Sequence, residues 1–192
     1  MLQRVLPYAK TLLSEVIKEG DIAIDATCGN GHDTLFLTEL VGDSGHVYGF
    51  DIQQQAIDTT KNRLEEHGVL NRATIILDGH ENLSKYVKEE ISGAVFNLGY
   101  LPGARHDVVT KGETTISAIR QLLKQLKIGG MIVLVVYHGH DGGKEERDAI
   151  INYVSSLPQK YVHVLRYEFI NQKNSPPFII ALEKMKTLPD SI

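Results

Sequence analysis

A short apolar segment near the start of the chain is followed by a loop with two glycines. Residues 25–34 are DATCGNGHDT, and Gly29 and Gly31 would let the backbone turn sharply and approach a ligand. Asp51 ends the next apolar segment, about 20 positions after Gly31. A carboxylate at that position can accept hydrogen bonds from both hydroxyls of a ribose. This spacing predicts a site for an adenosine-like cofactor.

The loop departs from the dinucleotide-binding pattern, and the departures indicate which cofactor it binds. The third glycine of G-x-G-x-x-G is replaced by Thr34, and the following helix opens with Asp33. The Asp33 carboxylate would repel a pyrophosphate at that helix N-terminus. S-adenosylmethionine carries no phosphate, and its cationic groups are compatible with Asp25 and Asp33. We therefore expect S-adenosylmethionine. The alternatives are a nicotinamide dinucleotide, or a tight strand-to-helix turn in which Asp33 only supplies a favourable helix charge.

Polar residues also follow two later apolar segments. Segment 73–77 continues into residues 78–81, DGHE, where a polar group could reach the edge of an adenine. The alternative is a solvated turn capped by its first aspartate. Segment 94–97 ends in Asn97 and is followed by Gly99. There, an amide side chain and backbone carbonyls could hold an amine by its N–H groups while its lone pair faces a methyl donor, although an ordinary loop would explain the same residues.

The apolar segment 131–137 is followed by two histidines and an aspartate, His138, His140 and Asp141. These residue types are good zinc ligands, but a zinc site needs a third or fourth ligand from elsewhere. The loosely available candidates are His80, His106 and His163. We therefore expect no metal. A contact to the substrate or a proton acceptor is the favoured interpretation, with His138 first because an unperturbed imidazole pKa lies near neutrality, and a solvated turn is the alternative.

Cys28 is the only cysteine of the chain. A thiolate nucleophile is one interpretation, as in enzymes that methylate C5 of pyrimidines. Its place inside the cofactor loop favours a small packing residue instead. A lone cysteine also excludes an intrachain disulfide and fits a reducing compartment such as the cytoplasm.

Hydrophobic periodicity predicts the elements that must position these residues. Helical spacing predicts a leading helix that ends at a C-cap glycine, Gly20, and further helices at 32–41, 53–67, 83–90, 113–126 and 144–157. Short apolar runs predict strands at 21–27, 46–51, 73–77, 94–97, 131–137, 161–170 and 178–184. This alternation predicts an α/β doubly wound fold with a parallel sheet, helices on both faces and an antiparallel pair formed by the last two strands. Ligands of such sheets bind beyond the carboxyl ends of the strands.

Length, composition and charge limit the remaining classes. The chain has 192 residues, of which 42% are hydrophobic and 23% charged, typical of one soluble globular domain covering 1–192 with a leading helix (1–19) and a C-terminal tail (185–192). The N-terminus lacks the apolar core of a signal peptide, and no window approaches the roughly 18 apolar residues of a membrane span. Because the net charge is −4, binding of a nucleic acid would need a local patch.

Five segments resemble one family of class I S-adenosylmethionine-dependent methyltransferases. They are DATCGNGHDT, HVYGFD, AVFNLGYLPG, VLVVYHGH and FINQKNSPPFIIALEK, and the similarity extends from the first helix to about Lys184. They resemble the bacterial tRNA enzymes that methylate 5-aminomethyl-2-thiouridine at the wobble position to 5-methylaminomethyl-2-thiouridine, earlier described as rRNA methylases. Two features depart from the general methyltransferase pattern: Thr27 replaces the first glycine of the loop, and Asn97-Leu98-Gly99-Tyr100 replaces Asn/Asp-Pro-Pro-Tyr.

The resemblance implies a Rossmann-like sheet with strand order 3-2-1-4-5-7-6, the last strand being antiparallel, and it implies roles for individual residues. The implied cofactor-binding residues are Asp25, Cys28, Gly29, Asn30, Gly31, Asp33, Asp51, Ile52, Gln53, Gly79, His80, Glu81 and Asn97. The implied catalytic residues are Asn97, Gly99, Tyr100, Tyr137 and His138. The candidates for RNA contact are Arg105, His106, Lys111, His140 and Lys173, and scattered surface charges are the alternative for each cation.

The expected reaction follows from this resemblance. The substrate would be the anticodon stem-loop of a tRNA, in the cytoplasm, with neither DNA nor membrane as a partner and a homodimer compatible with the sequence. An aminomethyl group is mostly protonated at neutral pH, so a proton must leave before in-line methyl transfer. His138 is the favoured acceptor, followed by His140 and Tyr137, unless alignment alone suffices. The alternatives are a methyltransferase for rRNA or a small amine, and a nucleotide-binding module without chemistry.

Overall fold

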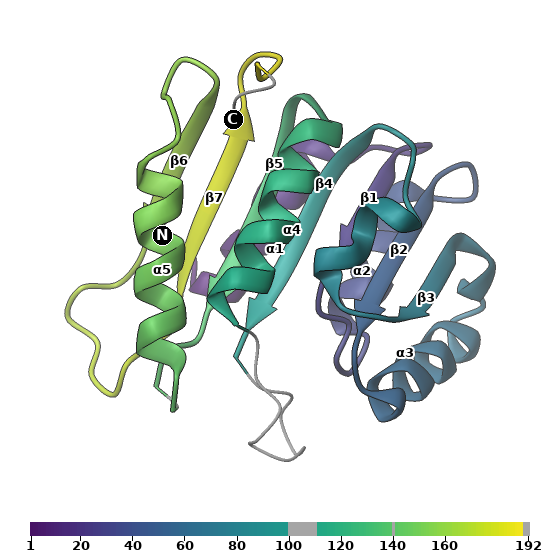
Figure 1. The fold of residues 1–192 in the computed structure, drawn as a ribbon. Coiled ribbons are helices and arrows are strands. Elements are labelled where there is room, and N and C mark those ends of the chain that lie inside the picture. The colour runs from purple at the N-terminus through teal and green to yellow at the C-terminus, as the bar shows by residue number, and fades with distance from the viewer. Residues whose placement is uncertain (100–110, 140, 190–192) are drawn as a thin grey trace.

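A computed structural model describes residues 1–99, 111–139 and 141–189 of the chain. These residues form a seven-stranded sheet of order β3-β2-β1-β4-β5-β7-β6 (Figure 1). The strands are β1 (Ile22–Asp25), β2 (His46–Asp51), β3 (Ala73–Leu77), β4 (Ile91–Leu98), β5 (Leu126–Val136), β6 (Val162–Tyr167) and β7 (Phe178–Lys184). The strands β1 to β5 pair in parallel, and β7 is antiparallel to β5 and β6. The expected fold class and strand order are confirmed.

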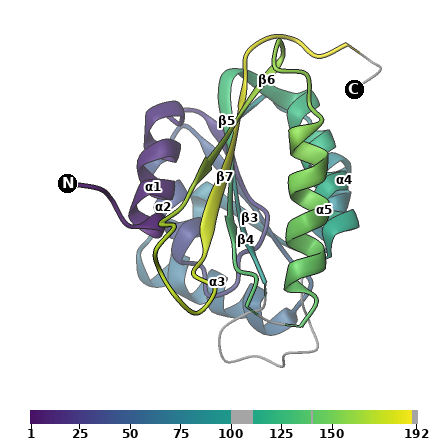
Figure 2. The ribbon, with the colours of Figure 1, turned by 90° about the vertical axis from the view of Figure 1, so that its left-hand side faces the viewer.

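Helices cover both faces of this sheet (Figure 2). The helices are α1 (Val5–Val16), α2 (His32–Val41), α3 (Gln54–Glu66), α4 (Gly112–Gln125) and α5 (Gly143–Ser155), with 3-10 helices η1 (Leu70–Arg72) and η2 (His80–Lys85). One core joins α1 and α2 to Val133 and Val135, and the other joins α4 and α5 to Ile132 and Leu134. Successive side chains of a strand point to opposite faces, so the continuous apolar run of β5 is required for burial on both sides.

The leading helix ends earlier than the sequence predicts. Its last residue is Val16, and Ile17 is already extended, so the expected C-cap role of Gly20 is wrong. Ile17 is almost fully buried, and a Cβ on Gly93 would lie 2.7 Å from its side-chain carbons. Packing of Ile17 onto the glycine of β4 therefore ends the helix, and Gly20 instead forms the turn into β1, where its N–H donates to the Val41 carbonyl.

Two further boundaries differ from the periodicity-based expectation. Residues 126–130, expected to end a helix and turn, belong to β5, whose register against β4 shifts between Ile91 and Gly93. Leu126 pairs with Ile91 and Met131 with Gly93, so the residues between them bulge out of the ladder. The helix expected at 83–90 is the 3-10 helix η2, which ends at Lys85. Pairing with β4 overrides the local pattern in the first case, and in the second Gln121 of α4 holds η2 through hydrogen bonds with Ser84 and the Glu81 carbonyl.

The parallel strands bring five carboxyl ends to one edge of the sheet. Asp25, Asp51, Leu77, Leu98 and Val136 end β1, β2, β3, β4 and β5. Residues that are far apart in the sequence and carry the expected chemistry therefore meet along this edge. Among the described residues, none of the helices combines the length and apolar character that crossing a bilayer requires.

Candidate cofactor and substrate site

The loop after β1 is organised around the buried carboxylate of Asp25. One carboxylate oxygen accepts the backbone N–H of Thr27 at 3.1 Å and the other the hydroxyl of Thr34 at 2.6 Å. Burial raises the Asp25 pKa to about 7, and the negative charge of Asp33 adds to the shift. Asp25 therefore fixes both ends of the loop by hydrogen bonds, although its carboxyl group is removed from water and is harder to ionise.

The two loop glycines have left-handed backbone conformations, with φ of 54° at Gly29 and 76° at Gly31. A Cβ at Gly31 would lie only 2.9 Å from the Cα of Thr60, so the glycine is required by both conformation and space. Helix α3 holds the loop from outside: the Arg63 Nε donates to the Asn30 carbonyl at 2.6 Å, and the Thr60 hydroxyl donates to the Gly29 carbonyl at 3.3 Å.

Asp51 joins the loop to the end of β2. Its Oδ2 accepts the N–H of Gly29 at 3.0 Å, and its Oδ1 accepts the N–H of Gln53 at 3.0 Å. Each carboxylate oxygen has a further lone pair, so the side chain can still accept two hydroxyl groups. Ile52 beside it is 60% exposed, as a residue that covers a flat ligand ring would be. These positions fit the ribose and adenine contacts expected for Asp51, Ile52 and Gln53.

Cys28 is buried in the same loop, with its N–H donating to the Phe50 carbonyl at 2.9 Å. A Cβ at Gly49 would lie 2.6 Å from the Cys28 Sγ, so the thiol fills the space over that glycine. Burial, together with the negative charge of Asp25, raises the pKa of the Cys28 thiol well above its usual range. A neutral, packed thiol favours the packing interpretation over a thiolate nucleophile.

The turn after β3 contains a buried histidine with one free nitrogen. The Nδ1 of His80 lies 3.0 Å from the Ala26 carbonyl, whereas its Nε2 is buried and has no hydrogen-bond partner among the described residues. Burial lowers the His80 pKa, so the ring is neutral; Nδ1 then carries the proton and Nε2 is an acceptor. Asp78 is bonded to Gly79, Asn82 and Tyr86, which is the capped turn weighed as an alternative for that residue. The side chain of Glu81 lies against Gly79, where a Cβ would clash with its carboxylate.

At the end of β4, Asn97 is bonded to the cofactor loop at two points. Its backbone N–H donates to the Thr27 hydroxyl at 2.7 Å, and its side-chain Nδ2 donates to the Asp33 carboxylate at 2.6 Å. Asn97 is half-buried, and Leu98 accepts the N–H of Tyr137 at the end of β5. The sheet and these bonds bring Asn97, Asp33 and Tyr137 to one place.

Both ring nitrogens of His138 are engaged. The Nε2 lies 3.2 Å from the Pro176 carbonyl and the Nδ1 lies 3.4 Å from Nη1 of Arg147 on α5. Left-handed backbone at Asn174 and Ser175 shapes the turn that brings the Pro176 carbonyl to this ring. His138 can therefore accept a proton only when its contact with Arg147 opens. Its role as proton acceptor stays a prediction, and the fixed ring is equally suited to contact a substrate base.

Several expected site residues lie outside the described part of the chain. These are Tyr100, Arg105, His106 and His140. Of the cations expected to contact RNA, two lie in the described part of the chain: Lys111, which is exposed just before α4, and Lys173, which is exposed between β6 and β7. Both segments adjoin the carboxyl-end edge of the sheet. Within residues 1–99, 111–139 and 141–189, no group of three metal-ligating side chains is arranged to hold an ion.

Sequence reasoning missed the residues that hold the loop in place. Thr60 lies on the buried face of α3 and Arg63 lies on the same helix, and neither belongs to a motif. Thr27 and Thr34 stand out in the sequence only as departures from glycine patterns. Arg147 of α5, which contacts His138, also carries no motif. The hydrogen bonds of Thr60, Arg63 and Thr27 join residues 31 or more positions apart, so they can be recognised only once the helices and strands are placed.

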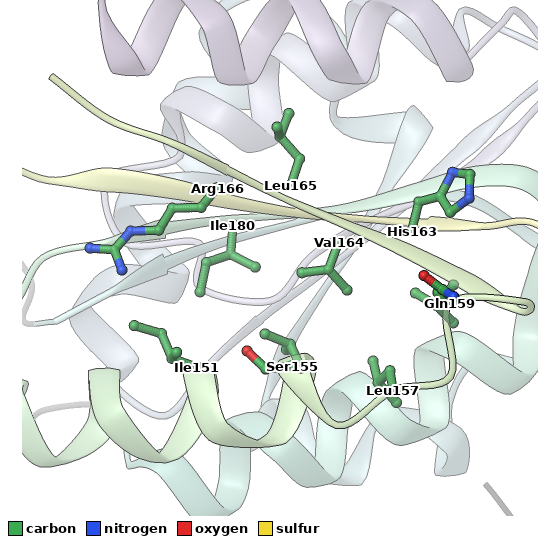
Figure 3. Close-up of a pocket in the computed structure, with 11 residues that line it drawn as sticks. Ile151, Ser155, Leu157, Gln159, His163, Val164, Leu165, Arg166 and Ile180 are labelled. Atoms are coloured by element: carbon green, nitrogen blue, oxygen red, sulfur yellow. The ribbon is translucent and has the colours of Figure 1, made fainter.

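A separate cavity of about 450 Å³ lies between α5 and the edge strand β6 (Figure 3). Ile151 and Ser155 of α5 face Val164 of β6 across it, with Ile180 of β7 behind. None of the expected cofactor or catalytic residues lines this cavity. The chemistry-bearing edge of the sheet and this hollow are therefore distinct features.

The chain is similar to known proteins in both sequence and structure. Residues 47–183 match the family described as "Putative rRNA methylase". A curated relative, the chloroplastic "tRNA (mnm(5)s(2)U34)-methyltransferase" of Arabidopsis thaliana, is 36% identical over 95% of this chain and 70% of its own length.

Two solved structures are also similar. The crystal structure of a "putative rRNA-methylase" from Clostridium thermocellum has a TM-score of 0.95 and 42% identity, covering 96% of this chain and 100% of its own. A "putative methyltransferase" from Streptococcus mutans, solved in complex with SAH, has a TM-score of 0.90 and 43% identity, covering 96% and 100%. Each likeness therefore extends over nearly the whole chain.

Proposed function

The chain belongs to the "Putative rRNA methylase" family and is an S-adenosylmethionine-dependent methyltransferase, and we propose that it methylates the wobble uridine of tRNA. The substrate group is the aminomethyl substituent of 5-aminomethyl-2-thiouridine, and the product is 5-methylaminomethyl-2-thiouridine. The observation that carries this proposal is the 36% identity, over 95% of the chain, to a relative named as a tRNA (mnm5s2U34)-methyltransferase.

The residues present fit the cofactor. SAH, bound in the Streptococcus mutans relative, is the form that S-adenosylmethionine takes after giving up its methyl group. Asp51 retains acceptor capacity for the ribose hydroxyls, and the loop at Gly29 and Gly31 has no Cβ that would block a ligand. The partnerless Nε2 of neutral His80 matches the amino group of an adenine. When bound, the cofactor supplies an electrophilic methyl group.

We assign the holding of the substrate amine to the carboxyl ends of β4 and β5. Asn97 accepts an N–H of the neutral amine, Tyr137 contacts the base, and His138 either contacts the base or accepts the proton that the ammonium must lose. Because the His138 ring is already bonded to Arg147 and to the Pro176 carbonyl, alignment contributes more to the rate than proton transfer does.

RNA is held, in this proposal, by cations at the rim of the same edge. Lys111 and Lys173 are exposed and flank the site in the fold, and Arg105, His106 and His140 are candidates from the undescribed segments. The anticodon stem-loop of tRNA is the proposed partner, the cytoplasm the proposed location and a homodimer the proposed assembly. Neither DNA nor a membrane is a proposed partner. With a net charge of −4, affinity for RNA depends on this local patch and weakens steeply with salt.

Mass spectrometry of tRNA nucleosides from a strain lacking this protein tests the proposal. We expect 5-aminomethyl-2-thiouridine to accumulate and 5-methylaminomethyl-2-thiouridine to disappear, and the purified protein with S-adenosylmethionine to restore the methylated nucleoside in vitro. Unchanged tRNA nucleosides, with methyl transfer to rRNA or to a small amine instead, would contradict it. Because the family description names rRNA, rRNA is the alternative substrate to assay beside tRNA under the same conditions.

A further inference from the structure

Asp33 and Asn97, both half-buried, form a hydrogen-bonded pair that joins the cofactor loop to the substrate side of the site. Asp33 stands in the first turn of α2, and Asn97 is the penultimate residue of β4. The Nδ2 of Asn97 lies 2.6 Å from an Asp33 carboxylate oxygen, and the Asn97 backbone N–H is held by Thr27. Among the described residues, none donates a hydrogen bond to the Oδ1 of Asn97.

The chemistry of the pair determines the orientation of the amide. A carboxylate can only accept hydrogen bonds, so it requires Asn97 to turn its NH₂ group toward Asp33. The Oδ1 is then the atom left for a ligand. If the amide were flipped, the NH₂ group would face the ligand and donate to the lone pair of an amine.

The two orientations have opposite consequences for a nucleophilic amine. An amide oxygen that accepts an N–H of the amine leaves its lone pair free for methyl transfer, whereas an amide NH₂ that donates to the lone pair blocks the nucleophile. We propose that Asp33 is a positioning residue which holds Asn97 as an acceptor toward the substrate amine. This inference rests on the proposed function, because it requires a substrate that reacts through a nitrogen lone pair.

The surroundings of Asp33 agree with a role on the substrate side. Its negative charge contributes to raising the Tyr137 pKa, after the larger effect of burial, so the carboxylate lies within electrostatic reach of a second residue of that face. A role confined to the N-terminus of α2 would require neither the Asn97 bond nor this proximity. The test must therefore separate positioning from helix charge.

The first test is a double-mutant cycle of Asp33→Asn and Asn97→Ala. Asparagine at position 33 can accept or donate, so both orientations of the Asn97 amide become accessible. We expect Asp33→Asn to lower kcat about 10-fold while the KM for tRNA and the affinity for S-adenosylhomocysteine change less than about twofold. In the Asn97→Ala background the same substitution should change kcat less than about twofold, because the group it positions is gone.

A reciprocal exchange sharpens the test. Asn97→Asp places two carboxylates against each other and should be slow, and adding Asp33→Asn should restore a donor–acceptor pair and raise kcat above that of either single variant. Glu39→Gln, an exposed position in the last turn of the same helix, controls for the loss of one net charge and should leave kcat unchanged, while the Asn97→Ala background controls for any effect of the charge in the first turn. A kcat unaffected by Asp33→Asn, or an equal loss in the Asn97→Ala background, overturns the inference.

A measurement without tRNA or donor separates this inference from the proposed function. In ¹⁵N NMR spectra of the ligand-free protein, one Asn97 side-chain amide proton should be shifted downfield and slow to exchange, and Asp33→Ala should abolish both features. If the chemical shift and exchange rate of the Asn97 side-chain amide do not change in Asp33→Ala, the pairing is wrong. If the NMR signature is present but neither the wild type nor any variant methylates tRNA or an amine, the proposed function is wrong and Asp33 has no amine to serve.

Discussion

The two halves of the carboxyl-end edge are built in different ways. On the β1–β2 half, Asp25 and Asp51 accept four hydrogen bonds from loop groups, and Asp25 is completely buried. On the β4–β5 half, the functional groups are half-exposed side chains, and the Oδ1 of Asn97 has no protein donor among the described residues. The first half is a preformed cradle, the loop 25–31 held by the Asp25 and Asp51 carboxylates. The second half presents side chains whose remaining hydrogen bonds a substrate must supply. Substitutions should therefore affect cofactor affinity on one side and turnover on the other.

The largest expected effect is on the cradle. Asp51→Ala removes the acceptor of the Gly29 and Gln53 N–H groups and of the ribose hydroxyls. We expect the binding free energy of S-adenosylhomocysteine, measured by calorimetry, to weaken by about 2 to 4 kcal/mol. Asp58→Ala, an exposed carboxylate of α3 bonded only to Gln54 among the described residues, is the control. An affinity loss of less than about threefold would show that Asp51 does not hold the ribose.

The next effect separates the second half from the first. Asn97→Ala should lower kcat at saturating tRNA by about 100-fold through lost alignment of the amine. Binding of S-adenosylhomocysteine should change little, because Asp51 and the glycine loop remain intact. Single-turnover kinetics at saturating donor measure the effect. Full turnover, or a loss carried entirely by cofactor affinity, would place Asn97 in the cradle instead.

Burial of Asp25 should make the cradle sensitive to pH. Its folded-state pKa of about 7 lies above the value in the unfolded chain, so the folded protein binds the extra proton, and the free energy of unfolding falls as pH rises toward 7. The fall should amount to on the order of 1 kcal/mol per pH unit between about pH 5 and 7 and should level off above. Asp25→Asn should flatten this slope in urea titrations at several pH values. An unchanged slope would mean that Asp25 stays ionised when folded.

His138→Ala should have a smaller effect, confined to the second half. We expect a loss in rate of about 10-fold at neutral pH, below the range typical of a dedicated base, because Arg147 and the Pro176 carbonyl already engage the ring. The loss should shrink as pH rises toward the pKa of the amine, since solvent then supplies the neutral nucleophile. A defect that is independent of pH would assign His138 to contact with the base alone.

The smallest expected effect is that of metal removal. Neither half of the edge brings three metal-ligating side chains together within the described residues. Activity should survive dialysis against a chelator with less than about a twofold change in kcat, and elemental analysis should find no stoichiometric metal. Loss of activity on chelation, restored by zinc, would show that His138 and the undescribed His140 bind an ion.

Local patterns determined much of this protein. Alternating apolar runs and helical spacing are sufficient to predict a doubly wound sheet with an antiparallel edge pair, because burial on both faces requires continuous apolar strands. Gly29, Gly31 and Asp51 could be identified because a tight loop and a ribose acceptor have fixed spacing along the chain. The strand order came from resemblance to a family, since periodicity does not specify which strands are neighbours.

Tertiary structure decided the contacts between segments that are distant in the sequence. Ile17 ends α1 because it meets Gly93, and residues 126–130 join β5 because β4 provides a partner. The pairing of Asp33 with Asn97, the clamping of Asn30 by Arg63 and the engagement of His138 by Arg147 each join residues from different elements. Such pairs carry no local signal, because a hydrogen bond between two side chains depends on where folding places their backbones and not on their spacing in the chain.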